Sequence, residues 1–382
     1  MDFDQGERVM RLRERLRLLI DQHVPGWYRG PFKDDASVRA TERFCRVLAD
    51  ERLLTIDWPA EWGGEDAGVW EQTAVREEMW AHDEPRGAQY MGLSWVGPAI
   101  MRHGTAEQKA MHLPLIGRGD VTWCQGFSEP EAGSDLASLK LAATPQDDGG
   151  WRLYGQKIWT SYASLAQWCF LAARTDTGQR RQKGLTVFLV PLDRRGVEVR
   201  PIAAMMGTHH LNEIFFDGVQ VGPEDVLGEV DAGWDVIRTV LSFERIGIPR
   251  YARSDRLLAQ LWPAVASEPP SAPLRLAHAR TSVHCRVARL LAYRVLAIGE
   301  QAGELPAHEP ALQRIASTLL DQEVAELAME VAGADGLDDA PGALLDGRAE
   351  DHWRYARAST VAAGTTEIQR LIIARELARE PR

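Results

Sequence analysis

The pattern of apolar residues changes twice along this chain of 382 residues, from helical to β-prone and back to helical. Over residues 1–118 apolar side chains recur at helical spacing, as in the run from Val9 to Leu19. Residues 119–228 hold short β-prone runs separated by Gly, Asp and Pro turns, and helical periodicity returns over 229–382. Segregated helices and strands predict an α+β fold with three domains at these limits.

Composition and charge exclude several classes of protein. Hydrophobic residues make up 45% of the chain and charged residues 26%, which excludes a disordered protein. A formal net charge of −11 disfavours binding to nucleic acid or anionic membranes, so an anionic ligand must meet local basic groups. No run approaches the roughly 20 apolar residues of a membrane span.

The N-terminal residues and the cysteines bear on the cellular compartment of the protein. The N-terminal residues alternate charged and apolar side chains and lack the apolar core of a signal peptide. Four scattered cysteines show no CxxC or metal-ligand spacing, which argues against a disulfide framework or a metal site. These features predict a cytoplasmic protein without a metal.

Two polar segments follow β-prone runs and are candidates for cofactor binding. SEPEAGSD (128–135) is rich in turn formers, hydroxyls and main-chain N–H groups, which suit a phosphate or a flavin edge. Trp159, Thr160 and Ser161 end another run, where an indole can cover a flat ring while a hydroxyl hydrogen-bonds to it. Taken alone, each segment also fits an ordinary turn or a core tryptophan beside a turn.

A carboxylate interrupts an otherwise apolar helical stripe. The stripe runs through Trp234, Ile237, Leu241, Glu244 and Ile248. Burial raises a carboxyl pKa towards neutrality, where a general base is effective. Alternatively, Glu244 forms a structural ion pair with Arg245 or another arginine. Pro249 should strain or end this helix near the carbonyl of Arg245.

Five motifs in a fixed order resemble the acyl-CoA dehydrogenase family over almost the whole chain. They are HGTAEQK (103–109), FSEPEAGSD (127–135), GQKIWTS (155–161), NEIFFDGVQV (212–221) and GTTEIQRLIIARE (364–376). The resemblance implies an N-terminal helical domain, a central β-barrel domain and a C-terminal four-helix bundle. It also implies FAD as cofactor and the α,β-dehydrogenation of an acyl-CoA or other acyl thioester, with the hydride passing to flavin N5.

The resemblance also implies roles for individual residues. The flavin ring would lie along Gln125, Phe127, Ser128, Trp159, Thr160 and Ser161, with the Ser161 hydroxyl near N5. Thr365 and Glu367 would reach the cofactor from the C-terminal domain. Ser134 and Arg245 would contact the substrate.

The sequence departs from the family pattern at the base. Many members carry a Glu in a TyrGluGlyThr run before the last helix, where this chain has residues 362–365, AlaAlaGlyThr. A minority place the base on the long helix that opens the C-terminal domain, and SerPheGluArg (242–245) matches them. Glu244 is therefore the predicted base, while the main-chain N–H of Ala363 stays available as an oxyanion donor.

A second departure concerns the adenine half of FAD. The usual ArgXaaXaaPheGly run is missing from its expected region, residues 257–275, and Glu330 stands where a Gln is common. Some bacterial members that act on bulky or steroid-like acyl thioesters divide the cofactor site between two different subunits. A homo-oligomer and a hetero-oligomer, as dimer or tetramer, both remain open.

Two rival functions also remain open. One is a dehydrogenase or oxidase of secondary metabolism that acts on an acyl chain tethered to a carrier protein. The other is a catalytically silent partner subunit, which retention of Glu244, Ser161 and Thr365 disfavours. The acyl group and the electron acceptor do not follow from the sequence.

Overall fold

The computed structural model describes residues 5–30, 34–178, 181–246, 248–267, 271–302, 305–338 and 342–378. Within these ranges, the side chains of residues 208, 242–246, 302 and 344 fall outside the description. The chain forms two units. The helical unit combines Met1–Arg29, Gly68–Glu84 and Arg245–Arg382, and the sheet unit combines Gly30–Ala67 and Pro85–Glu244.

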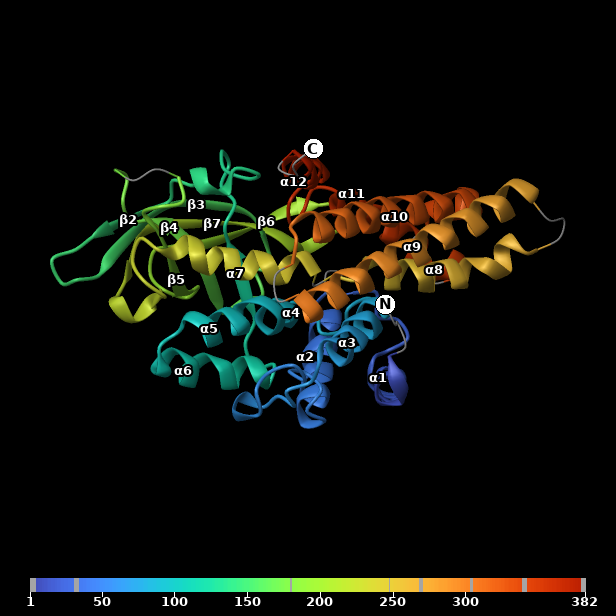
Figure 1. Cartoon of the computed structure of the whole chain (residues 1–382), viewed down its shortest axis with the longest axis horizontal. Coiled ribbons are helices and arrows are strands. Elements are labelled where there is room, and N and C mark those ends of the chain that lie inside the picture. Colours follow the sequence, from blue (N-terminus) through green and yellow to red (C-terminus); the bar gives the residue numbers. More distant parts are fainter. Residues whose placement is uncertain are drawn as a thin grey trace. The chain divides into compact units, whose positions relative to one another are not determined.

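The helical unit is assembled from both ends of the chain. Its helices are α1 (Gly6–His23), α3 (Val69–Ala81), α8 (Arg250–Val265), α9 (Ala272–Ala302), α10 (His308–Ala332), α11 (Arg348–Ser359) and α12 (Thr366–Leu377). Helix α10 packs against α8, α9, α11 and α12, while α3 packs against α1 and α8 (Figure 1). A shared apolar core that includes Leu261, Cys285 and Val324 removes one face of α8, α9 and α10 from water.

Short helices precede the strands in the sheet unit. They are α2 (Asp35–Asp50), α4 (Gln89–Met91), a π-helical turn at Gly92–Val96, α5 (Gly97–His103) and α6 (Ala106–Gly117). Thr105 and Gln108 form a capping box that starts α6, as expected for a Thr three residues before a Gln. Helix α7 (Gly233–Ile246) follows the last strand.

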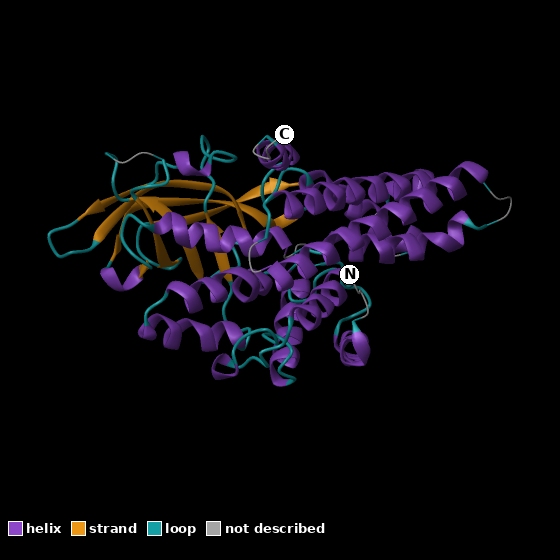
Figure 2. Ribbon diagram, in the orientation of Figure 1, coloured by secondary structure: helices purple, strands orange, loops and turns teal. Residues whose placement is uncertain are grey.

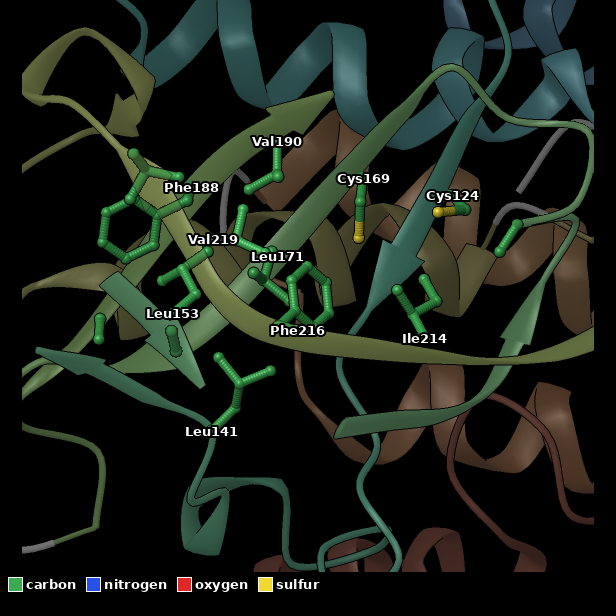
Figure 3. Packing of buried hydrophobic residues seen from close by; sticks show 14 of the residues in the cluster. Cys124, Leu141, Leu153, Cys169, Leu171, Phe188, Val190, Ile214, Phe216 and Val219 are labelled. Carbon is green, nitrogen blue, oxygen red and sulfur yellow. The ribbon is translucent and has the colours of Figure 1, made fainter. Parts of the chain in front are cut away.

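The described strands form one eight-stranded sheet within the sheet unit (Figure 2). They are β1 (Trp123–Gly126), β2 (Ala142–Pro145), β3 (Trp151–Ser161), β4 (Trp168–Arg174), β5 (Leu185–Pro191), β6 (Val197–Ala204), β7 (Gly207–Val221) and β8 (Val226–Leu227). Their order is β6-β7-β3-β2-β4-β5-β8, and β1 pairs with β4 in parallel. The sheet's apolar side chains gather in one core around Cys169, Phe188 and Phe216 (Figure 3).

The predicted α+β fold is confirmed, because helical N- and C-terminal regions flank a central sheet. The helical break near Pro249 is also observed, since α7 ends at Ile246 and α8 begins at Arg250. All four cysteines are buried thiols. Within the described part of the chain, no helix has the length and apolar character to cross a membrane. The three domain limits stay a prediction.

Candidate active site

The two polar motifs of the sheet unit meet where β1 ends. Gln125 lies in β1 opposite Phe170 of β4, and the buried ring of Phe127 packs 5.9 Å from that of Phe170, centroid to centroid. The carbonyl of the half-buried Ser128 accepts a hydrogen bond from the N–H of Ile158 at 3.0 Å. The loop after β1 is therefore attached to β3 one residue before Trp159.

A buried ion pair that the sequence analysis missed holds this loop. The Lys157 side chain is fully buried, and its Nζ donates to the Phe127 carbonyl (3.1 Å) and to Oε1 of Glu129 (2.7 Å). The Glu129 carboxylate also accepts from the main-chain N–H groups of Lys140 (2.7 Å) and Leu141 (2.9 Å). Burial lowers the pKa of Lys157 and Glu129 opposes that shift. The sequence signal for this pair was an acidic residue, Glu129, in the first motif and a basic residue, Lys157, in the second.

Next to this pair, β3 carries a bulge. The register between β3 and β7 shifts between Lys157 and Thr160, and Trp159 adopts a φ of 60°. This left-handed conformation is costly for an aromatic residue and is found mainly where surrounding structure imposes it. The Trp159 side chain is 56% exposed, whereas that of the adjacent Thr160 is buried. The bulge thus presents an indole at the surface of the sheet unit.

Thr160 and Asn212 provide buried polar atoms beside the bulge. The Asn212 amide donates to the Thr160 carbonyl at 3.1 Å, and both side chains are buried. Thr160 Oγ1 and Asn212 Oδ1 have no hydrogen-bond partner among the described residues. Buried polar atoms usually have partners. A bound planar group with polar edges would fit an exposed indole and an unsatisfied hydroxyl, so these residues fit a flavin.

We call residues 125–128, at the end of β1 and just after it, and residues 159–160 at the bulge the wall. Two further predicted residues of the sheet unit follow these segments in the chain. Ser161 is half-buried at the end of β3, opposite Leu211 of β7. Ser134 is exposed in the loop that follows the bridge between Glu129 and Ala132. Apart from Glu244, whose side chain lies outside the described residues, the sheet-unit candidates therefore lie on β1, the loop after it and the end of β3.

Thr365 and Glu367 belong to the helical unit, where they begin α12. Thr365 is the N-cap, and its Oγ1 accepts from the N–H of Ile368 at 3.2 Å. The pKa of the exposed Glu367 is lowered by a hydrogen bond from its own main-chain N–H and by neighbouring threonine hydroxyls. Ala363 and Gly364 precede the cap with φ of 54° and 88°. Both predicted residues thus stabilise the helix start.

Glu244 and Arg245 occupy the last turn of α7, but their side chains lie outside the described residues. The predictions for these two residues remain predictions. No group of His, Cys, Asp and Glu suited to a metal ion occurs in the parts of the chain that the structure describes.

The α+β fold, together with an exposed indole beside an unpartnered hydroxyl, fits the class of flavin-dependent oxidoreductases. The sequence matches the acyl-CoA dehydrogenase N-terminal domain over residues 8–120, the middle domain over 124–219 and the C-terminal domain over 231–378. The chain therefore belongs to the acyl-CoA dehydrogenase family, whose enzymes oxidise CH–CH groups. The predictions of family, oxidoreductase class and FAD as cofactor are confirmed.

Individual relatives have similar lengths. The acyl-CoA dehydrogenase IpdE1 of Mycobacterium tuberculosis (strain ATCC 25618 / H37Rv) is 37% identical over 369 residues, or 92% of this chain and 91% of the relative. The ChsE4-ChsE5 complex from Mycobacterium tuberculosis gives a TM-score of 0.89 at 28% identity over 100% of both chains. The Tcur3481-Tcur3483 steroid ACAD gives 0.88 at 29% identity, also over 100% of both chains.

Proposed function

We propose that this chain desaturates a bulky, steroid-like acyl-CoA between the α and β carbons, with Glu244 as the base. The observation that carries the proposal is the wall at the end of β3, where an exposed indole at a φ of 60° adjoins a buried, unpartnered hydroxyl. The similarity to a steroid acyl-CoA dehydrogenase supports the substrate class.

The chain's own residues have separate tasks in this reaction. FAD, held along Gln125 to Ser128 and Trp159 to Ser161, supplies the hydride acceptor when bound. The indole of Trp159 would cover the ring of bound FAD. The Thr160 hydroxyl, which has no partner among the described residues, would hydrogen-bond to it. Lys157 and Glu129 keep the loop of Ser134 in place for the thioester ligand.

Proton removal needs a base and a stabilised thioester carbonyl. Glu244, near the end of α7 and just before the helical break, takes the α proton. The main-chain N–H of Ala363 has no acceptor among the described residues, so it can donate to the carbonyl as negative charge develops. Replacement of the usual Glu by Ala363 leaves this donor in place.

The test is Glu244→Gln, which retains size and hydrogen bonding but removes the proton acceptor. Reduction of bound flavin by acyl-CoA should fall by roughly 10² to 10⁴, the contribution of general acid–base catalysis. FAD content and melting temperature should change little. Stopped-flow reduction and a thermal melt measure both quantities. Near-normal reduction in this variant, or a loss of stability of about 3–5 kcal/mol typical of a broken buried ion pair, would refute the role.

We also infer that the active form contains a second, different chain. The inference is supported by the missing ArgXaaXaaPheGly run and by the two-chain names of both solved relatives. Purified alone, the chain should hold less flavin and turn over more slowly than after co-expression with a candidate partner. Full FAD occupancy and full turnover in a homo-oligomer would exclude the partner requirement.

A further inference from the structure

The helical unit contains a polar pocket, open to solvent, that includes no residue assigned to FAD or substrate. We call it the arginine pocket. It is formed by the end of α3 and the residues just after it, one face of α8 and the start of α11. Its lining residues are Ala81, Asp83, Arg253, Arg256, Leu257, Gln260, Arg348 and His352.

Positive charge exceeds negative charge in this lining. Arg253 Nε lies 3.4 Å from Asp83 Oδ1, and Arg348 Nε lies 3.6 Å from Asp83 Oδ2. Outside the lining, Asp351 Oδ2 lies 3.5 Å from Nη2 of Arg253. These separations exceed the 2.7–2.9 Å of a strong charge-assisted hydrogen bond. One carboxylate in the lining is therefore shared, at a distance, by two guanidinium groups.

Arg256 is even less well neutralised. Its Nη1 donates to the Ala81 carbonyl at 3.0 Å, and no carboxylate among the described residues lies within ion-pair distance. Burial lowers the pKa of Arg256, Asp83 opposes the shift, and the positive charge of Arg348 adds to it. A guanidinium has five N–H donors, so Arg256 keeps most of them for another acceptor.

His352 adds an unpartnered acceptor to the same pocket. Its side chain is 1% exposed, and its Nε2 lies 3.2 Å from both the main-chain oxygen and Oδ1 of Asp321. Both neighbours are acceptors, so the ring proton belongs on Nε2. Burial lowers the pKa of His352 to about 4, so the ring is neutral at pH 7. Nδ1 then offers a lone pair that is buried and has no partner among the described residues.

We propose that the arginine pocket binds a small oxyanion of the phosphate class, with its charged oxygens on Arg253, Arg256 and Arg348 and its O–H donating to Nδ1 of His352. Hydrogen phosphate supplies both features, whereas sulfate at neutral pH has no O–H. This binding is independent of the proposed dehydrogenation.

Isothermal titration calorimetry of the full chain with inorganic phosphate, at pH 7.5 in chloride buffer, tests the site. Saturable binding is expected, and sulfate should bind at least tenfold more weakly because it lacks the O–H. Arg256→Gln should weaken phosphate binding at least tenfold, about 1.4 kcal/mol. Arg256→Lys should give an intermediate loss, because it retains the charge but not the fork of donors.

The matched control is Arg286→Gln, which removes an exposed arginine from α9 of the same unit and should leave phosphate affinity unchanged. A thermal melt verifies that each variant is folded. Competition with ADP and with CoA identifies the source: displacement of phosphate by either assigns the site to a phosphate group of that larger ligand, and no displacement assigns it to the free anion. Absence of saturable binding, or equal affinity in Arg256→Gln, would overturn the proposal.

Discussion

The two units bury charge in different ways. In the sheet unit, Lys157 and Glu129 form a buried pair whose remaining hydrogen bonds go to main-chain groups of the same sheet and loop. The helical unit holds a network of side chains from four helices, centred on two adjacent buried acids of α3. Its members are Arg13, Arg17, Glu77, Glu78, Tyr251 and Tyr293.

The two groups of buried charges have different structural roles: one fixes the position of a loop, and the other holds helices together. Lys157 links two segments of one sheet and holds the loop that carries the predicted cofactor-binding residues. Glu77 accepts from Tyr251 of α8 at 2.8 Å and from Tyr293 of α9 at 3.3 Å, and it pairs with Arg13 of α1. The network thereby joins helices from the beginning and the end of the chain. Loss of the first pair should affect cofactor binding, and loss of the second should affect the stability of the helical unit.

The largest effect on stability is expected for Glu77→Gln. The substitution breaks the buried pair between Arg13 and Glu77 and leaves Arg13 with Glu78 as its remaining carboxylate; breaking a buried ion pair costs about 3–5 kcal/mol. Urea unfolding measures the loss. The control, Glu71→Gln, breaks a pair with the largely exposed Arg8 and should cost no more than about 1 kcal/mol. Equal losses of stability in the two variants would show that the buried pair of Glu77 contributes no more than the pair of Glu71 with the exposed Arg8.

Lys157→Met should cost about 3 kcal/mol, the lower end for a broken buried pair, because Glu129 still accepts two main-chain hydrogen bonds. FAD content should fall with it, since the loop after β1 loses its anchor. The control is Lys140→Met, which breaks an exposed pair with Glu131 and should change stability by less than about 1 kcal/mol. A destabilised Lys157→Met protein with full FAD content would show a purely structural role.

Acidification should weaken both units, because each buries one neutral histidine. Burial lowers the pKa of His112 and of His352 to about 4, below the ordinary 6.5. The unfolded chain binds these protons first, so stability is full above pH 6.5 and is lost as pH falls towards 4. Each group contributes roughly 3 kcal/mol, from a pKa lowered by about 2.5 at 1.36 kcal/mol per pKa unit.

His112→Phe tests this pH dependence in the sheet unit. His112 packs edge-on between Trp123 and Trp168, at centroid distances of 5.2 and 4.7 Å, and Phe retains an aromatic ring there. Melting temperatures measured from pH 7 to pH 4 should fall less steeply in the variant. An unchanged slope would show that His112 is not the group that protonates.

The smallest effect on stability is expected for Thr160→Val. This substitution should lower FAD affinity without lowering the stability of the FAD-free protein. Because Thr160 Oγ1 has no described partner, its removal should leave the FAD-free protein equally stable or slightly more stable. FAD affinity should fall by about tenfold, the value of one lost hydrogen bond of ~1.4 kcal/mol. Thr144→Val, at an exposed position on β2, should change neither quantity. Unaltered FAD affinity in Thr160→Val would remove this hydroxyl from the site.

Much of the fold and part of the site follow from the sequence. The change from period 3.6 to β-prone runs and back predicted the order of helices and strands, which the structure confirms. The motifs around Ser128 and Trp159 indicated a flavoprotein of this family, which the domain matches confirm. The roles of single residues, including Glu244, stay predictions, because a motif names a residue without showing what its side chain contacts.

What the sequence determined by itself is the succession of elements and the family, since both depend on local patterns and on motifs read in order. Tertiary structure alone decided that Lys157 meets Glu129 across 28 positions, that a register shift forces Trp159 to a positive φ, and that α3 joins the helices of the C-terminal half. The physical reason is that side-chain pairing depends on strand register and helix packing, and many distant contacts set these together.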